Sequence, residues 1–255
     1  MKPANIAMAI SLLLLSGTLC LTAQETTVKF SGNFLTDQRL LVQDDFQWAW
    51  NENRLDLQLD ARFGNKVKFY TDVWFRNIGL PAVSSAYELY NKDIVQPFNL
   101  FIREGYVEFY GLLSKNLDVK IGKQRIAWGT GDKLNPTDNL NPADFEDIMD
   151  FGRYTGSIAL NMIYYFKNNS SLQGVYIPYF VPATTPIGVY AVAFEPALDV
   201  PPPFYVNQMS DSLVMPNINF SKSATASLKY KGFAAGFDFS LSYVWGYHGL
   251  PIPLH

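Results

Sequence analysis

The chain has little cysteine, little histidine and almost no net charge. Its one cysteine, Cys20, lies near the start, so we expect neither a disulfide framework nor a cysteine-based metal site in the rest of the chain. His248 and His255 are the only histidines, which argues against a Ser-His mechanism, and we expect no enzyme. A net charge of -3 provides no basic surface for a nucleic acid.

Long apolar runs are also absent after the N-terminus. Lys2, an apolar run over residues 6–15 and the break at Ser16 and Gly17 predict a signal peptide over residues 1–24, and therefore export. No later stretch approaches the roughly 18 apolar residues of a membrane-spanning helix. If the mature chain crosses a membrane, it must therefore do so with strands.

Apolar and polar residues alternate with a period of two. Residues 54–63 place Leu55, Leu57 and Leu59 on one side and charged residues on the other, which excludes a helix. A tight turn at 64–66 and a return segment over 67–76 complete a hairpin with one apolar face. Further candidate strands bring the total to about nine: residues 28–35, 102–110, 117–127, 158–166, 172–181, 224–230 and 233–243. We expect irregular backbone near Gly122 and Pro178, because cations follow the first and proline cannot pair within a ladder.

The connections between these strands alternate in length. Short links are expected at 64–66, 111–116, 167–171 and 231–232, and long ones at 36–53, 77–101, 128–155 and 182–223. Outer-membrane barrels have short periplasmic turns and long extracellular loops in this alternation. The fold class predicted for residues 25–255 is all-β, an antiparallel transmembrane β-barrel. An odd strand number and a loop-like end with Pro251 and Pro253 lead us to expect the N-terminal portion of a larger barrel.

One stretch has a distinctive motif. Residues 122–129 read G-K-Q-R-I-A-W-G and are followed by two L-N-P-x-D segments at 134–138 and 140–144; a proline-rich segment occupies 176–182. This pattern resembles the porin-like outer-membrane proteins related to the alginate-export and phosphate-selective porin group. The resemblance implies a barrel in the outer membrane of a Gram-negative bacterium, and it indicates substrate only weakly.

The motif also predicts a loop that folds into the pore as a constriction. Asn before proline favours the start of a short helical turn, and we expect a small helix over residues 143–150. A proline-stiffened surface loop is the alternative. The acidic residues of this loop have the oxygen ligands that calcium uses, but the EF-hand spacing is absent, and we expect no cofactor or metal. The candidate constriction residues are Trp128, Asp132, Asn135, Asp138, Asn141 and Asp144.

Charged residues on the polar strand faces are candidates for the lumen wall, where rings of charge set ion preference. Their signs are mixed, and cross-strand pairing as structural ladders is the alternative. Among the tryptophans, Trp74 is expected to point inward, and the others suit an interfacial girdle or a core. The candidate wall residues are Arg54, Asp56, Asp60, Arg62, Lys68, Asp72, Arg76, Glu104 and Glu108.

Three functions from different classes fit these features. The first is a passive channel for small polar or anionic solutes, in contact with outer-membrane lipid and with a homo-oligomer as an open alternative. The second is a component of lipid or polysaccharide export that needs a periplasmic partner. The third is a secreted β-sandwich that binds carbohydrate through its aromatic residues.

Overall fold

The structure is a computed structural model, and it describes residues 25–42, 46–129, 131, 135–194, 215–217 and 222–250. The predicted signal peptide, Asp132 and His255 lie outside the described residues. The statements below concern the described part of the chain.

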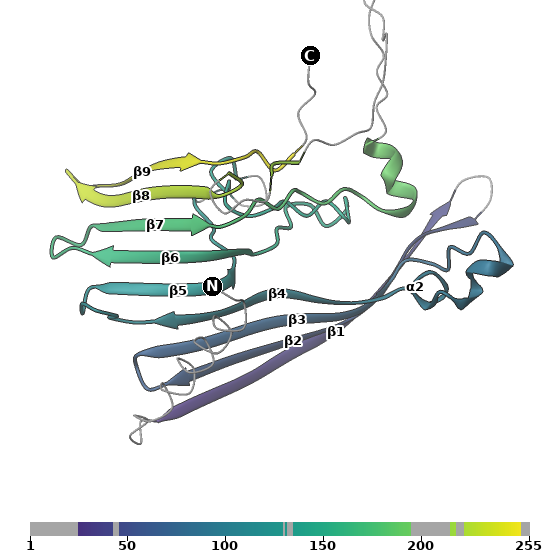
Figure 1. Cartoon of the computed structure of the whole chain (residues 1–255), viewed down its shortest axis with the longest axis horizontal. Helices are drawn as coiled ribbons and strands as arrows, with labels where there is room; N and C mark the ends of the chain where they lie inside the picture. Colours follow the sequence, from purple (N-terminus) through teal and green to yellow (C-terminus); the bar gives the residue numbers. More distant parts are fainter. Residues whose placement is uncertain are drawn as a thin grey trace, which may run out of the picture.

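The described residues form one antiparallel sheet of nine strands in which neighbours in sequence are neighbours in space (Figure 1). The sheet is not closed, because β1 and β9 are its two edges. The predicted all-β class, the antiparallel pairing and the number of strands are therefore confirmed. The strands are β1 (Thr26–Val42), β2 (Phe46–Phe63), β3 (Val67–Ile78), β4 (Phe98–Phe109), β5 (Leu117–Gln124), β6 (Ser157–Tyr165), β7 (Ser171–Ile177), β8 (Thr225–Ala234) and β9 (Phe237–Trp245).

Short turns gather at one end of the sheet, and the long connections β3–β4, β5–β6 and β7–β8 lie at the other (Figure 1). The predicted turn at 64–66 is confirmed, with Gly64 at a positive φ of 59°. The turn predicted at 231–232 is wrong, because β8 continues to Ala234 and reverses at Ala235 and Gly236. Both of these residues have positive φ, which is the backbone of a two-residue primed hairpin turn.

The first long connection is also different from the prediction. Residues 36–53 were expected to form a loop, but β1 and β2 continue as a paired hairpin through most of this segment. A register shift between Arg39 and Leu40 lets Trp48 and Trp50 point to opposite faces; Trp48 is exposed and Trp50 is buried. The prediction failed because the polar residues on both faces of this hairpin hide its alternation.

Two expected irregularities coincide with strand features. Gly122 has a φ of 125°, and a Cβ at this position would lie 2.4 Å from the carbonyl oxygen of Gly105 on β4, so only glycine fits there. Strand β5 ends shortly afterwards at Gln124, and β7 ends at Ile177, directly before Pro178. Both strands are therefore shorter than the predicted ranges 117–127 and 172–181.

The sheet has two faces of opposite character. The inner face is defined here as the one covered by the β5–β6 loop, of which the structure describes residues 125–129, 131 and 135–156, and the other is the outer face. Large apolar side chains lie exposed along the outer face, whereas in a soluble protein they would be packed away from water. Exposed outer-face residues include Phe30, Phe34, Leu55, Leu57, Leu100, Ile102, Ile121, Leu228, Leu241 and Tyr243.

Helices contribute little to the described structure. The 3-10 helix η2 (Ala86–Tyr90) and the α-helix α2 (Lys92–Val95) lie in the β3–β4 connection, and the 3-10 helix η3 (Gly188–Phe194) follows β7. None of the described helices has the length and apolarity needed to cross a membrane. The polar inner face and the loop that covers it are the features from which a site can be built.

Candidate functional site

All nine candidate wall residues lie on the inner face. Cross-strand partners share a face, and the register pairs Arg54 with Arg76, Arg62 with Lys68, and Asp72 with Glu104. The prediction from alternation, that these residues project to one side, is confirmed. Asp56, Asp72 and Arg76 are buried there, each less than a tenth exposed.

Part of this wall is an ion-pair ladder. Lys68 Nζ lies 3.1 Å from the Asp60 carboxylate, and Arg62 approaches the same carboxylate at 3.4 Å. Further along, Arg54 pairs with Glu52 at 3.1 Å and Lys120 with Glu108 at 3.7 Å. Lys68–Asp60 and Lys120–Glu108 join neighbouring strands, as the alternative of structural ladders expects. The Arg62 and Arg54 pairs lie within β2.

A bulge adds a cation that the alternation does not reveal. The β3–β4 register shifts between Asp72 and Val73, so that Arg103 is the extra residue on β4. Bulges redirect side chains, and the Arg103 guanidinium lies 4.2 Å from the ring centroid of Trp74, an inner-face residue. Arg103 donates a long hydrogen bond, 3.5 Å, to the Tyr154 carbonyl oxygen. Its guanidinium has no carboxylate within 4.0 Å among the described residues.

Trp74 is the centre of a group of arginines. It points inward, as predicted, and is 3% exposed. The Arg54 guanidinium lies 3.9 Å from its ring centroid, and those of Arg76 and Arg153 lie 5.6 and 5.8 Å away. Cations over an indole face are stabilised by the ring quadrupole. Trp74 thus helps to hold a dense positive cluster in place.

The β5–β6 loop is attached to β6 and β7 by apolar and amide contacts. Trp128 and Leu140 pack in a small core with Val175 and Ile177, and Trp128 Nε1 donates to Gln173 Oε1 at 3.0 Å. The side-chain amide of Asn141 pairs with the backbone of Ile126 as a neighbouring strand would. Its Nδ2 donates to the Ile126 carbonyl and its Oδ1 accepts from the Ile126 N–H, both at 2.9 Å. These residues shape the loop and are buried within it.

Other local predictions for the loop have mixed outcomes. Asn135 does start a turn, because its Oδ1 accepts from the Thr137 N–H at 3.1 Å. The helix expected over residues 143–150 is wrong: this segment is irregular, and Ala143 forms a bridge with Tyr154. The competing interaction is visible, because the Asp144 carboxylate binds Arg153 and the Thr184 hydroxyl and so fixes an extended backbone.

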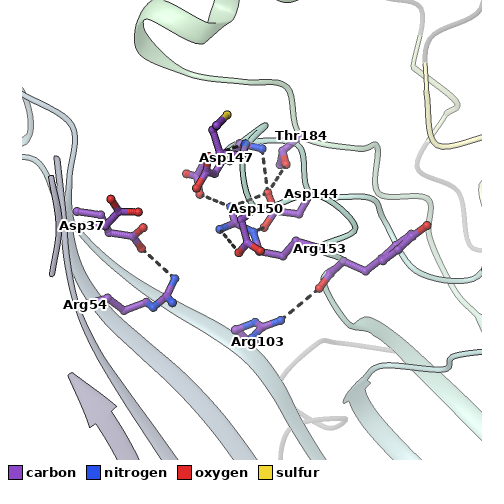
Figure 2. Close-up of polar contacts among 12 residues, drawn as sticks. Asp37, Arg54, Arg103, Asp144, Asp147, Asp150, Arg153 and Thr184 are labelled. Carbon is purple, nitrogen blue, oxygen red and sulfur yellow. Dashed lines mark hydrogen bonds and ion pairs between the residues drawn. The ribbon is translucent and has the colours of Figure 1, made fainter. Parts of the chain in front are cut away.

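The opposite side of the loop is attached to the wall by ion pairs. Arg39 of β1 donates to both carboxylate oxygens of Asp147, each at 2.7 Å. Arg76 of β3 makes the same bidentate contact with Glu146 at 2.7 and 2.8 Å. Arg153 donates to Asp144 at 2.7 Å and to Glu146 at 2.9 Å. Figure 2 shows Arg54 and Arg103 on the wall and Asp144, Asp150 and Arg153 on the loop that faces them.

Burial and pairing have opposite effects on the ionisation of the loop carboxylates. Burial disfavours the charged forms of Asp144 and Asp147, but the guanidinium partners outweigh it, and the pKa of each lies below its ordinary value. Burial dominates at Asp138, and its pKa is raised despite contacts with Asn141 and Arg125. Asp144 and Asp147 are therefore firmly anionic at neutral pH.

The described residues contain no group of three histidine, cysteine or acidic side chains that could hold a metal ion. The partners of Asp138, Asp144 and Asp147 are arginines instead. Five buried polar atoms of β2 and β3 have no hydrogen-bond partner, although such groups are normally satisfied. They are Trp50 Nε1, Arg54 Nε, Asp56 Oδ1, Asp72 Oδ1 and Trp74 Nε1.

The sequence predicts that Trp128, Asn135, Asp138, Asn141 and Asp144 belong to one loop, and in the structure all five lie in the β5–β6 loop that covers the inner face. The prediction missed Arg39, Arg103 and Arg153; the position of Arg103 depends on the register shift between β3 and β4, which the alternation does not show. No family model, curated protein or solved structure matched the chain. The resemblance to porin-like proteins thus stays a prediction.

Proposed function

We propose that this chain forms part of the wall of an outer-membrane β-barrel, whose water-filled lumen lets small polar solutes cross passively. The observation that carries the proposal is the polarity of the sheet. Its inner face bears charged side chains and is covered by the loop at 125–156, whereas its outer face exposes Leu55, Leu57 and Leu241.

This polarity is unfavourable in water and favourable in a bilayer. Each Å² of apolar surface removed from water stabilises by roughly 25 cal/mol, and a sheet in lipid must satisfy its backbone groups by strand pairing. Strands β2 to β8 have a partner on each side. A soluble sandwich would instead require a second layer over the outer face, and the described residues supply none.

Closure of the barrel requires additional strands. Nine strands in antiparallel order make β1 and β9 run in the same direction. A fully antiparallel barrel therefore takes an odd number of further strands between β9 and β1, in keeping with the even totals of bacterial barrels.

The mixed charges of the wall favour passage of polar solutes over selectivity for ions of one sign. The inner face bears charges of both signs, with arginines gathered around Trp74. Lys68, Arg62 and Arg54 are paired with carboxylates. Rings of one sign would be needed for strong selectivity. The loop at 125–156 narrows the lumen and limits the size of the solute.

The test is conductance of the full-length protein in planar lipid bilayers. We expect stepwise current with weak preference between cations and anions, and uptake of small sugars but not large ones into proteoliposomes. Heat-unfolded protein is the control. Protein that resists proteolysis in the membrane and passes no current would contradict the channel and favour partner-dependent export. Recovery of the native protein in the soluble periplasm would contradict the barrel itself.

A further inference from the structure

The β5–β6 loop is held at two sides by different chemistry. On one side Trp128 and Leu140 pack on β6 and β7 in an apolar cluster. On the other, residues 144–153 reach the wall formed by β1 and β3 through arginine–carboxylate pairs. The loop therefore spans the inner face of the sheet, and Arg39 and Asp147 meet although they are 108 residues apart in the chain.

We propose that Arg39 and Arg76 are positioning residues that hold this loop segment against the wall and thereby set the cross-section of the lumen. The inference rests on the proposed channel function, because a cross-section has meaning only in an open barrel. The assignment concerns these two arginines and their partners Asp147 and Glu146.

The geometry of each pair suits a positioning role. Both contacts are bidentate, which fixes orientation as well as distance. Arg39 is held from its own strand as well, since its Nε donates to Asp37 at 3.1 Å and its guanidinium lies 5.2 Å from the Trp50 ring centroid. An arginine that is already oriented loses less conformational freedom when the loop docks.

Burial makes the pairs strong enough to matter. The Asp147 side chain is 3% exposed and the Arg76 side chain 7%, so solvent and salt screen them weakly. Removing Arg39 leaves the buried Asp147 carboxylate without a guanidinium partner. Removing Asp147 leaves Arg39 paired with Asp37 alone. When the loop segment leaves the wall, water in the lumen can hydrate the unpaired charge. The apolar attachment at Trp128 stays intact.

Single-channel recordings of Arg39→Gln, Asp147→Asn and the double variant test the proposal. Each single change should shift the ratio of detached to attached loop by at least about tenfold and appear as larger, noisier conductance. The double variant should be no worse than either single one, because both remove the same contact. The conductance of Arg39→Lys should lie between those of the parent protein and Arg39→Gln, because an ammonium group cannot bind both oxygens in a fixed plane.

Asp150→Asn is the matched control. It makes the same chemical change in the same loop, but Asp150 is 53% exposed and lies 3.6 Å from Arg153. We expect the conductance of the parent protein. Conductance of Arg39→Gln and Asp147→Asn equal to that of Asp150→Asn would overturn the proposal, and so would additive effects in the double variant.

A second measurement separates failure of this inference from failure of the channel. Spin labels on cysteines at Gln38 and Met149, with Cys20 replaced, report the distance between β1 and the loop whether or not current flows. A narrow distribution that broadens with Asp147→Asn supports the positioning role. A broad distribution in the parent protein contradicts it, whereas a sealed barrel with a narrow distribution contradicts only the channel.

Discussion

Asn141 binds the backbone of Ile126 with both ends of its side-chain amide, donating to the carbonyl and accepting from the N–H at 2.9 Å each. Replacing Asn141 by alanine leaves two buried backbone groups without partners. We expect a loss of about 2 to 4 kcal/mol in the free energy of unfolding, measured by urea titration of the refolded protein in lipid vesicles.

Asn139, two residues earlier, provides a matched comparison for this variant. It is exposed and makes one side-chain hydrogen bond, 3.2 Å to the Pro136 carbonyl. Asn139→Ala should change stability by less than about 0.5 kcal/mol. Equal effects of the two variants would show that Asn141 does not anchor the loop.

Gly122 provides a second prediction, on the sheet itself. A Cβ there would meet backbone atoms of Gly105 and Tyr106 at 2.4 and 2.8 Å, and its φ of 125° is strained for other residues. Gly122→Ala should destabilise the sheet by about 2 to 4 kcal/mol. Gly174→Ala, with no atom within 4 Å of its Cβ, should be nearly neutral in the same titration.

The strands could be predicted because one face is apolar and the other polar over most of their length. Residues 54–63 and 67–76 show this clearly, and their faces and turn are as expected. The alternation disappears where polar residues occupy both faces, and the sequence therefore predicts a loop where the paired hairpin around Gln38 and Asn51 lies. Pairing there depends on backbone hydrogen bonds, which cannot be recognised from the pattern of side chains.

The site could be predicted only in outline. The motif around Trp128 indicated a loop that enters the barrel, but its contacts join residues far apart in sequence, such as Arg76 and Glu146. Local rules favoured a helix at 143–150, and long-range pairing of Asp144 with Arg153 and Thr184 prevented it. The position of Arg103 depends on a register shift against β3, which only the paired strands reveal.

Acid should detach the loop only at low pH. Asp144 and Asp147 have pKa values below their ordinary 3.8 because arginine partners outweigh burial. A lowered folded-state pKa gives stability that is present above the unfolded value and is lost as pH falls through the folded one. The attachment should therefore persist from pH 8 to about pH 5 and weaken below about pH 4.

Asp138 contributes with the opposite sign. Burial raises its pKa, so its protonation on mild acidification relieves an unfavourable charge instead of breaking the loop.

Hydrogen exchange of peptides covering residues 143–154, corrected for the intrinsic pH dependence, measures whether the Asp144 and Asp147 pairs hold this segment. Loss of protection already at about pH 6 would mean that these pairs do not hold the segment.

Leu57 tests which solvent the outer face meets. It lies on β2 between Gly32 and Val73, with its side chain 42% exposed. An arginine at the middle of a lipid-facing strand costs about 2 to 4 kcal/mol, whereas an arginine at an exposed position in water is nearly neutral. We therefore expect Leu57→Arg to unfold at lower urea concentration in lipid vesicles and to insert poorly.

Gln58→Arg is the neighbouring control, because Gln58 lies on the inner face opposite Asp72. An added cation there meets carboxylates and the aqueous lumen, so folding and insertion should match the parent protein. If the outer face instead met water, Leu57→Arg would fold at least as well as Gln58→Arg and would be more soluble. That result would contradict the membrane location, because an arginine on a lipid-facing strand should lower stability.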